Sequence, residues 1–382
     1  MRVAHVSDTH LGYTRYARLC PQTNRNQREV DVAVAYRRAV DAILERDVDL
    51  VIHSGDVFDS IRPATHVIVN FLKQTSRITR EGIPYLGIAG NHETPRLRTT
   101  TAALEYANLV GAYFAVGFES ERVRESAGGA EVTLTLVPHG AVGDSGVIVG
   151  PDPDADVNIM VTHGTVPGLV VRGHELGEID LPNRVLSDDF DYVALGHYHY
   201  FHEHKENAYY AGATERFGFA EVDSEPGFVV LEFSDSGVAL EHVPLEARPM
   251  IDLPKINAAG MTGADLTEGI RARTEDVDLT GAMVRLKVVD APRGVAGEVD
   301  RTLLRDLKRR CLDFSLDVTE AGAAAIEANG DGVGEGFGSL EEEFRAFVGD
   351  RREGGELSAA FAGQFLEKGL GYLRAASGGE GS

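Results

Sequence analysis

Residues 2–10 of this 382-residue chain read Arg-Val-Ala-His-Val-Ser-Asp-Thr-His, an apolar run that ends in a short polar motif. Four later motifs also follow apolar segments, namely Gly55-Asp56, Gly90-Asn91-His92-Glu93, Thr162-His163-Gly164 and Gly196-His197-Tyr198-His199. Near-continuous apolar runs are typical of strands covered on both faces, and α/β sheets bind their ligands beyond the carboxyl ends of such strands. The repeated pattern therefore predicts that the polar side chains converge on one site.

Alternating strand and helix patterns predict a layered α/β domain over residues 1–248. Pro244, Pro249 and Pro254 mark its end, and residues 249–320 predict a small α+β domain that has none of the metal-type motifs. In the first domain we expect strands at residues 2–7, 49–54, 83–89, 158–162 and 192–195, and helices at 28–46 and 63–79. In the second we expect strands at residues 251–256, 283–289 and 312–318, and helices at 264–273 and 299–310.

The end of the chain has a different composition. Residues 321–338 are rich in glycine and predict a flexible linker, and residues 339–376 predict a pair of amphipathic helices. Ser339 and Glu342 form a capping-box pattern at the start of the pair. Two interpretations of its apolar stripes are open, since the helices either dock on the rest of the protein or bind a partner. The stripes include Phe344, Phe347, Phe361 and Phe365.

Charge and composition indicate where the protein works. The formal net charge is -23, and only six of the 37 basic residues are lysines. Such a composition suits concentrated salt, in which repulsion between charges is screened. No apolar run approaches the roughly 18 to 20 residues of a membrane span. Because Cys20 and Cys311 are too few for a disulfide framework, we expect a soluble protein of a reducing, high-salt cytoplasm, with no membrane association.

An acidic chain is unusual for a protein that binds nucleic acid, since such proteins normally present a basic face. One stretch is locally basic, because residues 12–28 carry four arginines and no acidic residue. This stretch is either an ordinary solvated loop or a set of phosphate contacts. The candidate contacts are Arg15, Arg18, Arg25 and Arg28.

The five motifs supply Asp, Asn and His side chains, which suit divalent metals such as manganese, iron or zinc. Hydrolysis of a phosphodiester needs a strong nucleophile and neutralisation of phosphoryl charge, and two metal ions about 3.5 to 4 Å apart provide both. Asp56 is the expected bridging carboxylate. We expect one ion to be completed by Asp8, His10 and His199, and the other by Asn91, His163 and His197. A purely structural metal is disfavoured, because such sites are usually closed and rich in cysteine.

His92 stands next to Asn91 and therefore points in a different direction. This placement suits contact with the substrate phosphate or protonation of the leaving group. No Ser–His or Cys–His pattern suggests a covalent nucleophile, so we expect direct attack by water. Isolated histidines within strands, such as His5 and His53, are interpreted as core residues.

The order of the motifs resembles that of the calcineurin-like metallophosphoesterases. Three longer stretches further resemble the nuclease subunit of a DNA double-strand-break repair complex, the meiotic-recombination-eleven (SbcD-like) family. They are Ser7-Asp8-Thr9-His10-Leu11-Gly12-Tyr13, Asn26-Gln27-Arg28 and His53-Ser54-Gly55-Asp56-Val57-Phe58-Asp59-Ser60. The resemblance is specific up to His199 and covers the small domain and the tail in arrangement only.

The resemblance implies a metallophosphoesterase sandwich with a capping, DNA-binding domain. It implies a manganese-dependent exonuclease on duplex ends and endonuclease on single strands or hairpins, with two Mn²⁺ ions per subunit and Mg²⁺ as a substitute. The seven ligands named above carry over by position, with His92 as the catalytic histidine. It also implies a homodimer through the helices after Pro63 and near residues 99–108. The C-terminal helices would bind an SMC-like ATPase that gates access to DNA at the nucleoid, here of a halophilic archaeon.

Asp59 departs from some members of the family, which have at this position a histidine thought to help place the substrate phosphate. The balance between exonuclease and endonuclease activity is therefore open. Two other functions are also open. A phosphatase or phosphodiesterase for small phosphoesters would need the same metal site, but not the cap, the linker and the helical tail. A DNA-tethering scaffold would not need the catalytic residues.

Overall fold

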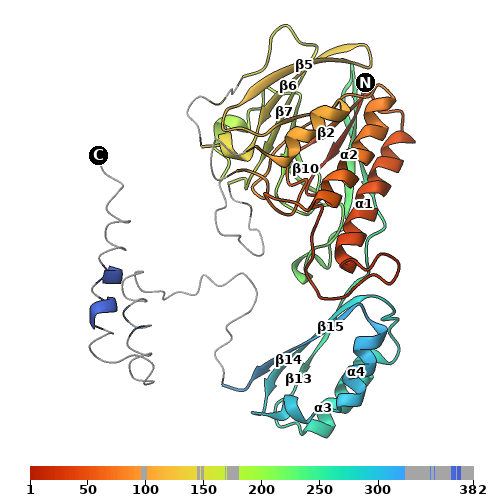
Figure 1. Cartoon of the computed structure of the whole chain (residues 1–382), viewed down its shortest axis with the longest axis vertical. Helices are drawn as coiled ribbons and strands as arrows, with labels where there is room; N and C mark the ends of the chain where they lie inside the picture. The colour runs from red at the N-terminus through yellow and green to blue at the C-terminus, as the bar shows by residue number, and fades with distance from the viewer. Residues whose placement is uncertain are drawn as a thin grey trace. The chain divides into compact units, whose positions relative to one another are not determined.

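The computed structural model describes residues 1–95, 101–143, 147, 150–167, 169, 180–322, 345, 348, 363–366 and 368–370. The chain forms two compact units, Met1–Ala325 and Ile326–Ser382. Among the described residues, the first unit contains two six-stranded sheets and one three-stranded sheet (Figure 1). Across these ranges, every helix is too short or too polar to cross a membrane.

The first sheet has the order β12-β11-β1-β2-β3-β4. Strands β1 to β4 are parallel, whereas β11 is antiparallel to β1 and β12 is antiparallel to β11. The carboxyl ends of β1, β2 and β3 therefore meet at one edge, just before the first three polar motifs. The strands are β1 (Arg2–Val6), β2 (Leu50–His53), β3 (Tyr85–Ile88), β4 (Tyr113–Ala115), β11 (Gly227–Ser234) and β12 (Gly237–Pro244).

The second sheet has the order β5-β6-β7-β8-β10-β9. Strands β6, β7, β8 and β10 are parallel, and the edge strands β5 and β9 pair antiparallel with β6 and β10. The two strands expected in this region, at residues 158–162 and 192–195, are β7 and β8. The strands are β5 (Glu121–Ala127), β6 (Ala130–Val137), β7 (Val157–His163), β8 (Tyr192–Gly196), β9 (His202–Lys205) and β10 (Ala208–Tyr210).

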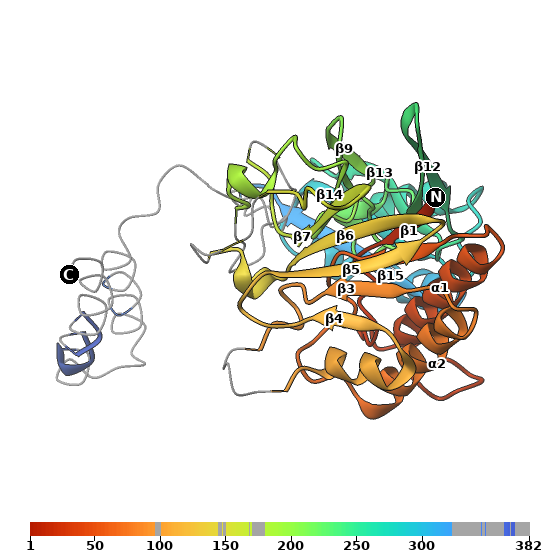
Figure 2. The same cartoon turned by 90° about the horizontal axis from the view of Figure 1, so that it is seen from above.

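The two sheets pack face to face, and helices α1 (Gln27–Leu44) and α2 (Thr65–Arg80) cover the other face of the first sheet (Figure 2). Strand alternation sorts the side chains between these layers. Val3 and Ile52 lie in the core between the sheets, and Ala4 and Val51 lie in the core under the helices. Short 3₁₀ turns complete the covering layers, namely η1 (Ala103–Val110), η2 (His139–Ala141) and η3 (Asn183–Val185).

Residues 249–320, which we call the small domain, have their own hydrophobic core and their own sheet, β13-β14-β15. The five predicted elements are present in the predicted order. All three strands are parallel, because each connection between them carries a helix back across the sheet. The elements are β13 (Met250–Asn257), α3 (Gly263–Thr274), β14 (Met283–Ala291), η5 (Val295–Glu298), α4 (Arg301–Arg310) and β15 (Asp313–Glu320).

A buried ion network joins α1 to the start of the small domain. The guanidinium of Arg248 binds both carboxylate oxygens of Asp31, and its Nη1 donates to the carbonyl oxygen of Gly281 at 2.8 Å. Arg28 contacts Asp31 at 2.9 Å and Glu215 at 3.7 Å. Burial raises the pKa of Asp31, but the hydrogen bonds from Arg248 outweigh this and hold that pKa below its usual range. Two arginines therefore balance two carboxylates at the junction.

The network corrects one prediction from the sequence. Arg28 was a candidate phosphate contact, but its side chain is only 1% exposed, and it also donates to the carbonyl oxygen of Arg216. A buried and paired guanidinium is not available to DNA. The other three candidates, Arg15, Arg18 and Arg25, are exposed.

The C-terminal predictions concern residues of the second unit. Phe344, Phe347 and Phe361 lie outside the described residues, as do residues 323–338 of the expected linker. Phe365 lies in a described helical segment and is 41% exposed. Partner binding by this region stays a prediction.

We predict that Arg28→Met destabilises the fold. Removing one member of a buried ionic network leaves its partners uncompensated, which typically costs about 3 to 5 kcal/mol. The free energy of unfolding, measured with denaturant, should fall by that amount. Arg37→Met, at an exposed position of the same helix, should change it by less than about 0.5 kcal/mol. Unchanged stability of Arg28→Met together with weaker DNA binding would instead support the phosphate-contact interpretation.

Candidate metal centre

The seven predicted ligands lie at the carboxyl ends of five strands. Asp8 and His10 follow β1, Asp56 follows β2 and Asn91 follows β3, all in the first sheet. His163 ends β7, and His197 and His199 follow β8, in the second sheet. Because the sheets face each other, the two sets of side chains meet at one end of the sandwich.

The backbone turns sharply at four of these seven positions. Asp8, His10, Asp56 and His197 have positive φ angles of 48°, 40°, 53° and 104°. Residues other than glycine rarely adopt such angles, although Asp and His do so more often than most. Hydrogen bonds between neighbouring turns hold the conformation, from the Asp8 amide to the Gly55 carbonyl at 3.1 Å and from the His10 amide to the Asp56 carbonyl at 3.0 Å. Strain of this kind concentrates at functional sites.

Two of the motif glycines are required because atoms of a neighbouring loop lie where a side chain would begin. A Cβ atom at Gly90 would fall on Oδ1 of Asp56, and one at Gly196 would fall on the Ser54 carbonyl oxygen. Both glycines therefore let a neighbouring strand end come close enough for its ligand to reach the site. This explains why glycine directly precedes Asn91 and His197.

Asp8, His10 and His199 form the first donor group, with ligand atoms within 4.8 Å of one another. The Nε2 atoms of His10 and His199 are 3.2 Å apart. The other ring nitrogen of His199, Nδ1, donates to Glu221 Oε1 at 2.7 Å, which directs Nε2 toward the site. Two imidazole nitrogens and a carboxylate in one place are a donor set that fits a divalent cation.

Asp56, His163 and His197 form the second donor group, again within 4.8 Å. Oδ1 of Asn91 joins it, at 2.9 Å from His163 Nε2 and 3.2 Å from His197 Nδ1. Oδ2 of Asp56 is 3.4 Å from His163 Nε2 and 3.6 Å from His10 Nε2 of the first group. Asp56 therefore lies between the two groups, at the position expected of a bridging carboxylate.

The electrostatics of the site favour positive charge. Burial lowers the pKa of His163, but the Asp56 carboxylate outweighs this effect and raises it to about 9. Burial likewise opposes protonation of His199, but Glu221 raises its pKa to about 9. The same field that holds a proton on these rings would stabilise a divalent cation in its place.

His92 lies beside the donor groups in an orientation set by the backbone. Its Nδ1 atom is 3.1 Å from the Asp59 carbonyl oxygen, which fits donation from an Nδ1–H. Its ring packs edge-on against His10, with 4.6 Å between the centroids. The Asp59 carboxylate is 3.5 Å from His10 Nδ1. Asp59, His10 and His92 thus form a third cluster of donor atoms within 4.8 Å.

Two carboxylates that support the site were not among the predicted residues. Glu93 is 3% exposed and accepts hydrogen bonds from the backbone amides of Asp56, Phe58 and Gly90 at 2.7 to 3.1 Å. It ties the loops after β2 and β3 together, and burial and the nearby Asp56 raise its pKa to about 8. Its place in the third motif was a usable signal. Glu221, which orients His199, lies 22 residues further along the chain in η4 (Phe219–Glu221), where no motif marks it.

Comparison with known proteins gives the family of the part of the chain that carries these residues. The model of the Calcineurin-like phosphoesterase family matches residues 1–201, which include the whole ligand set. The DNA double-strand break repair protein Mre11 of Methanopyrus kandleri is 29% identical over 282 residues, covering 68% of this chain and 60% of the relative. The Mre11 protein of Haloferax volcanii is 30% identical over 286 residues, covering 74% of this chain and 60% of the relative.

A third relative is matched over more of its own length. The Mre11 protein of Halobacterium salinarum is 27% identical over 314 residues, which cover 78% of this chain and 74% of the relative. For the relatives from M. kandleri and H. volcanii, the match spans only 60% of their length. These three relatives are DNA double-strand break repair proteins named Mre11, and the chain belongs to the calcineurin-like phosphoesterase family.

Proposed function

We propose that the protein is a manganese-dependent DNA nuclease that processes double-strand breaks. It would act as an exonuclease on duplex ends and as an endonuclease on single strands or hairpins. The observation that carries this proposal is the position of Asp56 between two donor groups, with His92 beside them. The names of the Mre11 relatives, which are DNA double-strand break repair proteins, support DNA as the substrate.

Each donor group would hold one ion. Asp8, His10 and His199 would bind the first, Asn91, His163 and His197 the second, and Asp56 would be shared. When bound, two Mn²⁺ ions, or Mg²⁺ as a substitute, would supply an activated water and neutralise charge on the phosphoryl group. The protein's own contribution is to hold the ligands in place, through Ser54 for His163 and Glu221 for His199.

His92 is the proposed catalytic residue. The contact between Nδ1 and the Asp59 carbonyl orients the ring, and Nε2 is the atom that we propose meets the substrate. An imidazole there can donate to a phosphate oxygen or protonate the leaving oxygen. Because Asp59 positions His92 through its backbone, this role does not depend on the Asp59 side chain.

Substrate and partners are part of the proposal. Exposed Arg15, Arg18 and Arg25 and the small domain would contact DNA, weakly in so acidic a chain, at the nucleoid of the cytoplasm. A homodimer would form through α2 and η1, where apolar side chains are exposed, and the C-terminal helices would bind an SMC-like ATPase. The exposed side chains near the proposed dimer face are Val69 (42%), Tyr106 (47%), Leu109 (78%) and Tyr113 (36%).

The substrate class is tested with a panel. Purified protein with Mn²⁺ should cleave linear duplex ends and DNA hairpins, with and without the ATPase, and chelation of the metal should abolish cleavage. Turnover of a chromogenic phosphodiester without any DNA cleavage, even with the ATPase present, would favour an enzyme for small phosphoesters.

Replacing the proposed acid should separate catalysis from metal binding. We expect His92→Ala to lower DNA cleavage by about 10² to 10⁴, the usual contribution of a general acid, while the protein folds and retains Mn²⁺. His66→Ala, on the surface of α2 and hydrogen-bonded to Glu29, is the matched control with unchanged activity. Full cleavage by His92→Ala would contradict the assignment. Full repair in cells that carry an inactive His92→Ala protein would favour the scaffold interpretation.

The helical tail is tested by truncation. Deleting residues from Ser339 onward should abolish binding of the ATPase and leave the oligomeric state and Mn²⁺ content unchanged, as measured by light scattering and metal analysis. Aggregation of the truncated protein would show that the helices instead cover part of the core.

A further inference from the structure

Residues 215–224, which we call the bridge segment, contact both the candidate metal centre and the small domain. The segment leaves the nuclease sandwich after β10, includes η4 and returns to it at β11. None of the sequence motifs covers it. These two contacts together suggest that the small domain influences the metal centre.

At the metal centre, the bridge segment packs on two of the proposed ligands. The Phe217 ring lies edge-on against His10 and His199, at centroid distances of 4.7 and 5.1 Å. Glu221 accepts a hydrogen bond from Nδ1 of His199 at 2.7 Å and another from the Phe217 amide at 2.7 Å. One carboxylate therefore connects a ligand of the first donor group to the backbone of the segment.

On its other side, the bridge segment contacts the small domain. The guanidinium of Arg285, on β14, lies 4.6 Å from the centre of the Phe219 ring. Two hydrogen bonds to Asp252 on β13, at 2.6 and 3.0 Å, hold that guanidinium in place. Phe219 and Val222 also pack against an apolar cluster formed by Met250, Met283 and Leu312 of the small domain. The turn that carries Glu221 thus rests on the small domain.

The sandwich also holds the segment. The Tyr13 hydroxyl donates to the Phe217 carbonyl oxygen, and the Tyr200 hydroxyl donates to the Ala220 carbonyl oxygen at 2.6 Å. These bonds fix the backbone on the sandwich side, while the side chains of Phe219 and Val222 meet the small domain. Changes in docking should therefore alter the position of His199 only in part. The second donor group is supported differently, since Ser54 in the sandwich holds His163 at 2.8 Å.

We propose that docking of the small domain on the bridge segment sets the affinity of the metal position formed by Asp8, His10 and His199. In this proposal Glu221 is a positioning residue for His199, and Phe219 transmits the docked state of the small domain to it. The proposal rests on the two-ion site proposed above. Coupling between two sites is reciprocal, so a ligand that shifts the small domain would change metal occupancy, and metal would in turn favour docking.

The test is calorimetric titration of the metal-free full-length protein with Mn²⁺, without DNA. Glu221→Gln should lower the affinity for one of the two Mn²⁺ ions by about tenfold or more, which is the usual effect of losing a residue that orients a metal ligand. Arg285→Leu leaves every proposed ligand and Glu221 in place. It should lower the affinity for the same ion by only about threefold, because a cation–π contact is a weak interaction. Phe219→Leu removes the same contact while keeping an apolar side chain, and serves if Arg285→Leu does not fold.

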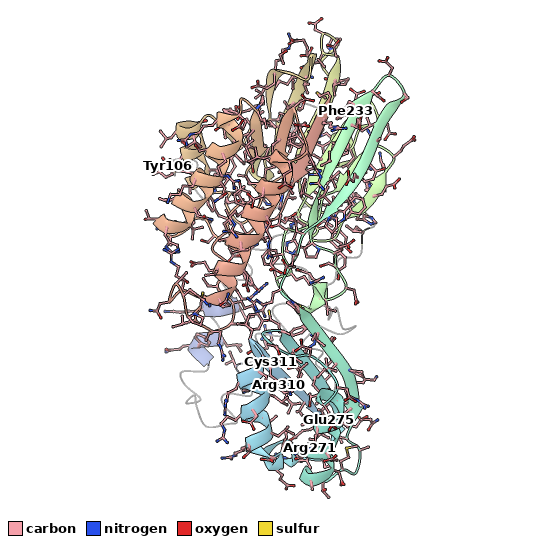
Figure 3. The ribbon with its side chains drawn as sticks, turned by 90° about the vertical axis from the view of Figure 1, so that its right-hand side faces the viewer. Tyr106, Phe233, Arg271, Glu275, Arg310 and Cys311 are labelled. Carbon is pink, nitrogen blue, oxygen red and sulfur yellow. The ribbon has the colours of Figure 1, made fainter. Side chains whose placement is uncertain are left out.

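Arg271→Leu is the matched control. Arg271 lies on α3 of the small domain (Figure 3) and pairs with Glu268 at 3.5 Å, so its replacement removes the same charge without touching the bridge segment. It should leave both affinities unchanged. Unchanged Mn²⁺ affinities in Arg285→Leu and Phe219→Leu, with a weakened ion in Glu221→Gln, would overturn the link to the small domain. Binding of two Mn²⁺ ions with wild-type affinity in all variants would overturn the role of Glu221 as well. Absence of Mn²⁺ binding by the wild-type protein would overturn the proposed function itself.

Discussion

The buried carboxylate of Asp56 is the constraint around which the site is organised. Asp56 is 1% exposed, and a charge so far from water is costly unless other charges and hydrogen bonds compensate it. Burial raises its pKa, but His163 and His10 outweigh this and hold it well below its usual range. The amide of His92 donates to its Oδ1 at 3.0 Å. Histidines from both sheets therefore gather around one anion, and this arrangement suits a pair of cations.

The fold serves this convergence. Parallel strands bring Asp8, Asp56 and Asn91 to one edge of the first sheet, and face-to-face packing brings His163, His197 and His199 from the second. The proposed ligands lie on strained turns, and glycines beside them allow close approach of neighbouring chain segments. Glu93 then ties two of these turns together with three hydrogen bonds. Strain at the ligands is thus balanced by a rigid sandwich, as expected for a preorganised site.

Much of this arrangement could be predicted from sequence, because the buried parallel strands are continuous apolar runs that end in polar motifs. The strands that were missed do not share one pattern. β6 and β11 are largely buried, but none of the five polar motifs follows them. β5 and β12 are mostly exposed, so they carry many polar residues and their sequences resemble those of loops. Residues whose role depends on distant partners were also hidden. Arg28 looked like a surface cation in a basic stretch, and only the fold shows that it pairs with Glu215, which is far away in sequence.

The central claim is that two ions share Asp56. Anomalous diffraction from crystals of the full-length protein grown with Mn²⁺ tests it most directly. The account predicts two peaks about 3.5 to 4 Å apart, one beside Asp8, His10 and His199 and the other beside Asn91, His163 and His197, with the carboxylate of Asp56 bound to both. A single peak, or a pair that Asp56 does not touch, would contradict it.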